Sequence, residues 1–252
     1  SAAYAVVAYM TAYLKANYYV PFFAAILTGA VNNTDNLIKY ITECRENNVE
    51  ILPPDINKSE KAFTVVGSKI RFGLSGIKNV GDAALDNIIG VRENIGEFTS
   101  FTQFCTMMDS RKVNKKVLES LAKAGCFDNL GLKRSEILYI IQERFEKLQK
   151  KDVKNGYQMD IFGTQYEMNS LPDIPDMNEL SHSEILRCEK EAFGFYFSKH
   201  PLATYEKIIQ QITPYNTQSL REIDITEDVD LACIVSTSRE ITTKKGNKMA
   251  YV

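Results

Sequence analysis

Apolar side chains recur every three to four positions through most of this chain, and that spacing predicts helices that bury one face. Pro21 favours the first turn of a helix, and Asn33, Thr34 and Asp35 can each cap one. The aromatic residues of the first helices are expected to lie in the core. The predicted helices cover about residues 2–16, a segment through Phe22 and Leu27, a segment with Leu37, Ile38 and Ile41 facing inward, and residues 81–93, 99–108, 114–124, 135–150 (capped by Ser135), 183–192 and 202–211.

Strands are expected in two places. After Pro53, which breaks the helical pattern, residues 63–66 and 69–72 flank a Gly-Ser pair and predict a two-stranded hairpin. Further on, residues 229–235 alternate between two faces, and a Lys-Lys-Gly-Asn turn leads to a second expected strand at 248–252. We interpret this tail as the opening of a β-barrel domain. The predicted fold class is therefore mainly α, with a small β-hairpin and the first strands of a truncated barrel.

The helical periodicity fails between residues 151 and 180, where Lys, Asn, Gly, Met and Pro predominate and indicate a linker. Two large apolar side chains, Ile161 and Phe162, stand in this linker. A short linear motif of this kind can insert its apolar side chains into a pocket on a partner protein while a glutamine anchors it. The alternative is that Phe162 folds back onto its own domain. The candidate motif consists of Gln158, Met159, Asp160, Ile161 and Phe162.

The composition is that of an ordinary folded protein, with 44% hydrophobic and 25% charged residues. The net charge of −2 conceals a partition. Residues 1–52 carry −1, residues 53–155 carry +5 and residues 156–252 carry −6. Only the middle segment is therefore a candidate surface for a polyanion. A solvated basic face would have the same composition.

The five cysteines are odd in number and too far apart for a CxxC zinc or redox site, which favours a reducing cytoplasm. No stretch has the length and apolar character of a membrane span, and no secretory signal is recognisable, so no membrane partner is expected. The sequence starts at Ser1 inside a predicted helix and stops at Val252 inside an apolar run. We therefore expect a piece of a longer protein.

The strongest signal for chemistry is a tight turn that leads from a short helix into a new one, and it resembles the helix–hairpin–helix motif. The amide N–H groups of Val80, Gly81 and Asp82 are expected to be unpaired at a helix N-terminus, which favours a phosphate. Asn79 stands where glycine is usual, and asparagine tolerates left-handed backbone better than most residues. A plain αα-turn packed on a neighbour is the alternative. The candidate contacts are Gly76, Lys78, Asn79, Val80 and Gly81.

A second candidate turn, from Ala124 to Asp128, closes the helix that follows Asn114. Its Phe127 is expected in the core, and the charge of Asp128 disfavours phosphate. Two hairpins in tandem favour nucleic acid more than either alone, although a solvated basic face is the alternative here too. Basic residues precede this turn, and Lys112, Lys116 and Lys123 are expected on one helical face. The basic candidates are Lys112, Lys115, Lys116 and Lys123, beside Arg111.

We assign no catalytic residue and no metal ligand. His182 and His200 have no Cys or carboxylate at metal-ligand spacing. The sequence contains no P-loop, no Gly-x-Ser-x-Gly and no GxGxxG. It also lacks an isolated pair of acids flanked by apolar strand residues, which a two-metal phosphoryl-transfer site requires.

Several blocks of the sequence occur in a characteristic order. They are Ser1–Ala5, Leu14–Ala16 with Pro21–Phe22, Asn33–Asp35, Ile51–Asn57, Arg71–Leu74, Gly76–Lys78, Val113–Glu119, Gly125–Asp128 and Gly194–Leu202. Taken together, these blocks resemble one family, the bacterial replicative DNA polymerase III alpha subunits, and the likeness covers nearly the whole chain in one register.

The resemblance implies four segments. Residues 1–52 would be the end of the fingers, and residues 53–150 a tandem helix–hairpin–helix domain that holds duplex DNA. Residues 151–180 would be a linker with the motif for the sliding clamp, in which Ile161 replaces the more usual Leu. Residues 181–252 would be connecting helices and the start of an OB domain.

The resemblance also implies a parent enzyme, a DNA-directed DNA polymerase in the cytoplasm. The family's palm carboxylates, which bind two Mg²⁺ ions for nucleotidyl transfer, lie upstream of the matching segment. This piece is therefore expected to hold no cofactor and to be inactive alone. Its expected partners are double-stranded DNA, the sliding clamp and other replicase subunits.

Two other classes of protein remain open at this point. One is a repair or ligation protein with helix–hairpin–helix and OB modules, such as an NAD-dependent DNA ligase, which should carry a zinc-binding Cys cluster that this sequence lacks. The other is a non-enzymatic adaptor that binds a partner through residues 156–163 and no DNA. Salt-dependent binding to a duplex separates the adaptor from the polymerase piece.

Overall fold

The computed structural model describes residues 2–143, 174–216, 219–221, 228–235, 238–242 and 248–251. The described residues confirm a mainly helical fold with small sheets. The chain divides into two compact units, Ser1–Ser198 and Lys199–Val252. Each unit is described by itself below.

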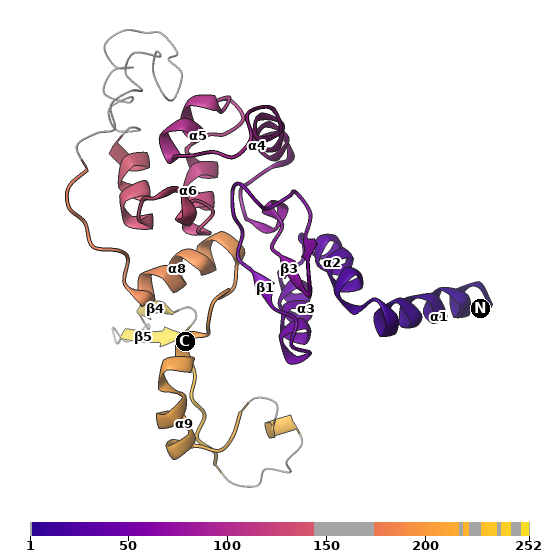
Figure 1. Ribbon diagram of the computed structural model, residues 1–252. Helices are drawn as coiled ribbons and strands as arrows, with labels where there is room; N and C mark the ends of the chain where they lie inside the picture. Colours follow the sequence, from indigo (N-terminus) through magenta and orange to yellow (C-terminus); the bar gives the residue numbers. More distant parts are fainter. Residues whose placement is uncertain are drawn as a thin grey trace. The chain divides into compact units, whose positions relative to one another are not determined.

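Helices make up most of the first unit (Figure 1). Their positions agree with the predicted ones to within a few residues, and the last part of the predicted helix 135–150 lies outside the described residues. In chain order they are α1 (Ala2–Asn17), α2 (Tyr19–Gly29), α3 (Thr34–Glu46), the 3₁₀ turn η1 (Leu74–Gly76), α4 (Asp82–Ile95), α5 (Phe101–Met107), α6 (Lys115–Lys123), the 3₁₀ turn η2 (Asp128–Leu130), a helical segment at 134–143, and α8 (His182–Phe193).

Side-chain caps explain where several of these helices begin. Asn33 accepts a hydrogen bond from the backbone N–H of Asn36 at the start of α3, at 3.0 Å. Ser100 caps α5 in the same way, and Ser181 forms a capping box with Glu184 at the start of α8. Each cap satisfies a backbone donor that the first helical turn leaves unpaired.

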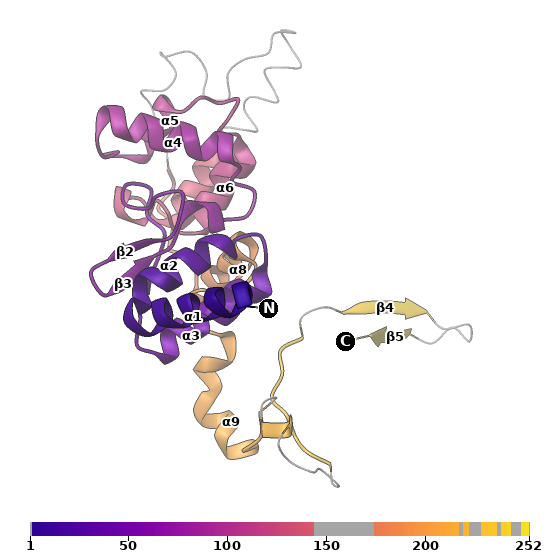
Figure 2. The same ribbon diagram turned by 90° about the vertical axis from the view of Figure 1, so that its right-hand side faces the viewer.

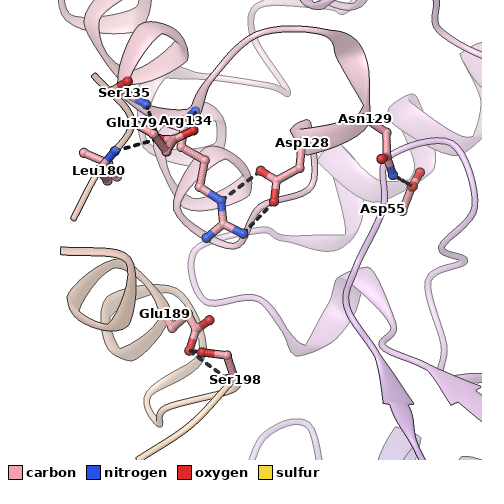
Figure 3. A network of polar contacts seen from close by, with 9 residues as sticks. All are labelled: Asp55, Asp128, Asn129, Arg134, Ser135, Glu179, Leu180, Glu189 and Ser198. Atoms are coloured by element: carbon pink, nitrogen blue, oxygen red, sulfur yellow. Dashed lines mark hydrogen bonds and ion pairs between the residues drawn. The ribbon is translucent and has the colours of Figure 1, made fainter. Parts of the chain in front are cut away.

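The predicted Ser135 cap is wrong. The helix begins at residue 134, and the carboxylate of Glu179 accepts hydrogen bonds from the backbone N–H groups of Arg134 and Ser135, at 3.1 and 3.3 Å (Figure 3). The buried Ser135 hydroxyl has no hydrogen-bond partner among the described residues. A carboxylate from a distant part of the chain supplies the cap, and local sequence signals do not report such a contact.

A three-stranded sheet lies between the helices, with strand order β1-β3-β2. β2 (Thr64–Val66) and β3 (Lys69–Arg71) form the predicted antiparallel hairpin, and Gly67 in its turn has φ +60°. β1 (Ile51–Leu52) pairs parallel with β3 and was not predicted. A strand of two residues shows no alternation from which it could be recognised.

The prediction that the aromatic residues of the first helices lie in the core holds for α2 and is wrong for α1. Phe23 and Leu27 of α2 are buried, whereas α1 has no buried residue and Tyr4 is 82% exposed. The apolar side chains of α1 point to all sides of the helix, and α1 packs mainly against α2, with one ion pair from Lys15 to Glu43 of α3. One packed neighbour cannot bury a helix that is apolar all round. In α3, Ile38 is also exposed, at 37%, contrary to expectation.

One cluster of buried residues extends from Phe23 to Phe197. Within it, the Phe72 ring centroid lies 4.6 Å from that of Phe63, 4.9 Å from Phe193 and 5.5 Å from Phe197. These separations are typical of favourable aromatic pairs. The end of α8 is therefore packed directly against the residues that lead from β3 into η1.

The second unit contains a strand pair, which Figure 2 shows side by side. The pair is antiparallel, with Arg239 opposite Tyr251. The expected strand at 229–235 is wrong, because residues 228–235 form no regular structure and the strand comes later. A segment with alternating side chains forms a strand only when a neighbouring segment pairs with it through hydrogen bonds. The described strands do not close a barrel. The elements are η3 (Pro201–Tyr205), α9 (Glu206–Ile212), η4 (Ser219–Arg221), β4 (Arg239–Thr242) and β5 (Lys248–Tyr251).

A search of the described helices for a membrane span finds none with the required length and apolar character.

Candidate nucleic-acid interface

The first hairpin, defined as residues 77–81, connects η1 to α4. Ile77 and Val80 are buried and fasten it to the core. Asn79 takes the left-handed backbone conformation, with φ +65°, which asparagine tolerates better than most residues. The turn therefore forms without the usual glycine. The Asn79 amide also donates a hydrogen bond to Ser120 Oγ in α6, at 3.3 Å.

The two glycines of the predicted motif have different physical roles. A Cβ atom on Gly76 would lie 2.6 Å from the ring of Phe72, so close packing of the core requires a glycine there. Gly81 is exposed and has nothing within 4 Å of the position its Cβ would take. The fold therefore leaves the space over Gly81 open, and a ligand can approach its backbone closely.

The N-terminus of α4 has no side-chain cap, because its N-cap residue is Gly81. The N–H groups of Gly81 and Asp82 have no hydrogen-bond partner among the described residues. Val80 differs from the prediction, since its N–H donates to the carbonyl of Ile77 at 3.4 Å and its side chain is buried. Two of the three expected amides thus remain available to an anion at the positive end of the helix dipole.

Lys61 is a charged neighbour of this helix start that the sequence analysis did not single out. Its ammonium lies 2.7 Å from Asp82 and 3.4 Å from Asp86. The hydrogen bond to Asp82 is the main cause that raises the pKa of Lys61. The negative charge of Asp82, which would oppose a phosphate, is therefore partly balanced. Lys61 precedes α4 by about twenty residues, so no local pattern indicates this pair.

The second hairpin lies between α5 and α6, at residues 108–114. Val113 is buried and directly precedes the N-cap residue Asn114, just as Val80 precedes Gly81. Exposed basic residues stand before that valine, as Lys78 stands before Val80. The repeated order of basic residue, buried valine and N-cap is the signal by which this hairpin could have been found.

The predicted second hairpin, at residues 124–128, is therefore wrong. Ala124, Gly125, Cys126 and Phe127 are all buried, so the backbone of this turn is not accessible to DNA. The expectation that Phe127 lies in the core is confirmed.

An ion pair explains the sequence of that buried turn. The guanidinium of Arg134 donates to both carboxylate oxygens of Asp128, at 2.8 and 2.6 Å (Figure 3). A Cβ atom on Gly125 would collide with this guanidinium. Asp128 is thus paired with Arg134, and Gly125 suits both its φ of +80° and the space that the guanidinium occupies.

The two hairpins are joined reciprocally. The first hairpin reaches α6 through Asn79 and Ser120, and the second reaches α4, because the backbone N–H of Asp109 donates to Asn87 Oδ1 at 3.0 Å. Lys116 is exposed and stands one turn before Ser120 on α6. Residues four apart share a helix face, so Lys116 lies on the side of α6 that meets the first hairpin.

The basic candidates fall into two groups. Lys78, Lys112 and Lys116 are exposed. Lys123 lies 2.7 Å from Glu191 of α8, and Lys115 lies 3.6 Å from Glu119 and 3.0 Å from the Gln142 side chain, so these two help to hold the fold together.

The expected single helical face of Lys112, Lys116 and Lys123 is wrong. Lys112 lies in the turn before α6 and not on the helix.

The motif from Gln158 to Phe162 lies outside the described residues. Among the residues that are described, no group of three or more His, Cys, Asp or Glu side chains is arranged to hold a metal ion. Burial raises the pKa of the Cys44 thiol to about 12 and also raises the pKa of Cys126 and Cys188. These thiols are therefore protonated near neutral pH and are poor nucleophiles.

Comparison with known proteins identifies the arrangement of the middle segment. A family model described as a helix-hairpin-helix motif matches residues 48–137, which include both hairpins. Over 100% of the chain, the sequence is 39% identical to the DNA polymerase III subunit alpha of Borreliella burgdorferi and 36% identical to that of Neisseria meningitidis serogroup A. The subunit of Aquifex aeolicus is 36% identical over 99% of the chain.

The hairpins and the family match therefore define a helix–hairpin–helix segment within residues 48–137. In sequence, the chain is similar to one segment of the DNA polymerase III alpha subunits and fits the C-terminal part of that subunit. It spans about a fifth of the length of these relatives, 22% for the first two and 20% for the third.

Proposed function

We propose that this chain is the part of a DNA polymerase III alpha subunit that binds duplex DNA through phosphates, without reading bases. The observation that carries the proposal is the start of α4, which has no side-chain cap and has open space over Gly81. A phosphodiester oxygen at this point accepts hydrogen bonds from backbone N–H groups that the protein leaves unpaired. Backbone donors of this kind fix position on the duplex and carry no sequence information.

Electrostatics supports the same proposal. Lys78 lies in the first hairpin, Lys112 in the second, and Lys116 on the face of α6 between them. A surface that bears exposed cations beside two helix starts attracts a polyanion and releases its counterions. The exposed Arg111, beside Lys112, adds a further cation to this surface.

A substitution that fills the space over Gly81 tests the proposal. Gly81→Val should weaken binding of the chain to a fluorescent duplex in anisotropy titrations, and equally for two duplexes of unrelated sequence. Gly90→Val is the matched control, because Gly90 lies on the same helix and also has open space around it. Equal affinities for Gly81→Val and Gly90→Val would contradict a backbone phosphate site.

For the parent protein we propose DNA-directed DNA polymerase activity in the cytoplasm, with other replicase subunits as partners. The similarity to DNA polymerase III alpha subunits supports this proposal. By the resemblance to the family, Mg²⁺ would bind to palm carboxylates elsewhere in the parent. The 252-residue chain should therefore give no product in a primer-extension assay with Mg²⁺ and all four nucleotides. Primer extension above background would contradict the assignment of the catalytic carboxylates to another part of the parent protein.

We also propose that residues 158–162 bind the sliding clamp, on the strength of their composition and their resemblance to the family motif. Burying a phenylalanine contributes roughly 1.5–3 kcal/mol, so Phe162→Ala should weaken clamp binding on the order of tenfold to a hundredfold. Ile161→Ala should cost less. A titration of the chain with the clamp measures both. Unchanged affinity in Phe162→Ala would leave the segment as a tether only.

A further inference from the structure

Gly194 lies directly beneath the side chain of Lys78. It follows the last residue of α8 and has φ +91°, a conformation that ends helices and favours glycine. A Cβ atom on Gly194 would lie 2.7 Å from Lys78 Cε and still closer to its Nζ. The lysine chain therefore crosses the end of α8 through the space that a side chain at 194 would fill.

Backbone contacts hold the same two segments together. The N–H of Lys78 donates to the carbonyl of Ala192, in the last turn of α8, at 2.7 Å. Phe193 packs against Phe72, and Phe72 in turn fills the space beside Gly76. The end of α8 is thus a fixed platform under the first hairpin, although about 115 residues separate them in sequence.

The electrostatic potential at the end of α8 favours a positively charged group such as the Lys78 ammonium. The C-terminal end of a helix carries partial negative charge from its unpaired carbonyls. The ammonium of Lys78 lies at that end of α8, which restrains a side chain that otherwise has many rotamers. Because Lys78 remains exposed, its charge is still available at the hairpin surface.

We infer that Gly194 is a positioning residue of the phosphate-binding surface, because it allows α8 to hold Lys78 in place for a phosphate. The inference rests on the proposed function. Ordering a flexible side chain upon binding opposes association, and a lysine that is already held avoids much of that cost. The helix α8 would then be a part of the DNA-binding surface.

Gly194→Ala tests the inference in the whole 252-residue chain. The nearest obstacle to the new methyl group is the flexible end of Lys78, which must move, and the next is Thr34 Cγ2 at 3.2 Å, which must give way by a few tenths of an ångström. Gly131→Ala is the matched control, since Gly131 has φ +82° and nothing within 4 Å. Both variants impose similar backbone strain, but only Gly194→Ala moves the lysine.

Duplex affinity should fall about two- to tenfold in Gly194→Ala and remain unchanged in Gly131→Ala. In a Lys78→Ala background, Gly194→Ala should cause no further loss of duplex affinity. The double variant also removes the clash between residue 194 and Lys78, so it can be used if the single variant is poorly folded. A second readout needs no DNA: the rate of Lys78 acetylation by acetic anhydride, followed by peptide mass spectrometry, should rise in Gly194→Ala only.

The results separate this inference from the proposed function. If wild type binds duplex and Lys78→Ala weakens binding, equal behaviour of Gly194→Ala and Gly131→Ala in affinity and in acetylation overturns the inference alone. If wild type does not bind duplex, or if Lys78→Ala binds duplex as tightly as wild type, then Lys78 does not contribute to DNA binding. That result contradicts both the role of Lys78 in the proposed function and the inference about Gly194.

Discussion

At the scale of single residues, small differences in chemistry decide which part of each hairpin faces a ligand. Gly76 and Gly81 look equivalent in the motif, but they differ in their surroundings. The ring of Phe72 leaves no room for a side chain at Gly76, whereas the space around Gly81 is open. Asn79 replaces a usual glycine because asparagine accepts the left-handed backbone. Asp82 is the residue at which fold and function conflict, since its carboxylate favours the helix start and opposes a phosphate.

Asp82→Asn should change stability and DNA affinity in opposite directions. The variant loses a favourable charge at the helix start and its pair with Lys61, so unfolding free energy should fall by about 0.3–1 kcal/mol. Duplex affinity at low salt should rise about two- to fivefold, because the like charge disappears and Lys61 is released. Thermal unfolding and anisotropy measure the two effects.

Asp86→Asn is the control for this prediction. Asp86 lies one turn further from the helix start and is the more distant partner of Lys61, at 3.4 Å. Its replacement should raise affinity less than Asp82→Asn does. If Asp82→Asn binds duplex no better than Asp86→Asn, no phosphate sits at the start of α4.

At the scale of elements, the sequence was sufficient for several features with a local signal. Asn33 was predicted as a cap and directly precedes α3, and the hairpin of β2 and β3 contains its own turn. Asn114 and Ser181 also directly precede their helices, but they were not predicted as caps. Errors arose where a distant segment decides. Strand β1 needs β3, and the start of the helix 134–143 needs Glu179.

The candidate site shows the same division. The first hairpin was predicted from one continuous stretch, and the left-handed backbone of Asn79 agrees with that prediction, whereas Val80 is buried and its N–H is paired. The second was assigned to residues 124–128 because a glycine and basic neighbours occur there. Burial of that turn against Arg134 excludes it, and the contacts of Lys61 and Gly194 are visible only in three dimensions.

The capping box of α8 predicts a stability change in acid. Hydrogen bonds from the hydroxyl and the backbone N–H of Ser181 lower the pKa of Glu184 below its ordinary value of 4.5. A carboxylate with a lowered pKa stabilises the fold above its ordinary pKa, and this contribution is lost as the pH falls through the lowered value. Glu184→Gln should therefore have a lower melting temperature than wild type near pH 7, with the difference shrinking below about pH 4.5.

Ser181→Ala provides a second variant for this measurement. It removes the partner of Glu184 and should cost about 0.5–2 kcal/mol near pH 7. Its difference from wild type should shrink over the same acid range. A difference that stays constant from pH 7 to pH 3 in both variants would show that Glu184 does not contribute through its charge.

At the scale of the whole molecule, the hairpins are not an isolated module. One buried cluster connects α2, the sheet, both hairpin helices and the end of α8, and α8 lies beneath the first hairpin through Lys78 and Ala192. The chain spans about a fifth of the length of the alpha subunits that it matches. Under the proposed function, this compact unit would hold duplex DNA. Its contribution would be affinity for the DNA backbone.

The most direct test of this account is the salt dependence of duplex binding by the chain in which Lys78, Lys112 and Lys116 are all replaced by alanine. Each phosphate that a lysine neutralises contributes about 0.9 to the slope of log K against log salt, so the triple variant should lose roughly 2.7 units of slope. Lys115→Ala/Lys123→Ala is the control, since both ammonium groups have contacts within the protein, and its slope should change much less. An unchanged slope in the triple variant would contradict the account and leave these lysines as a solvated face.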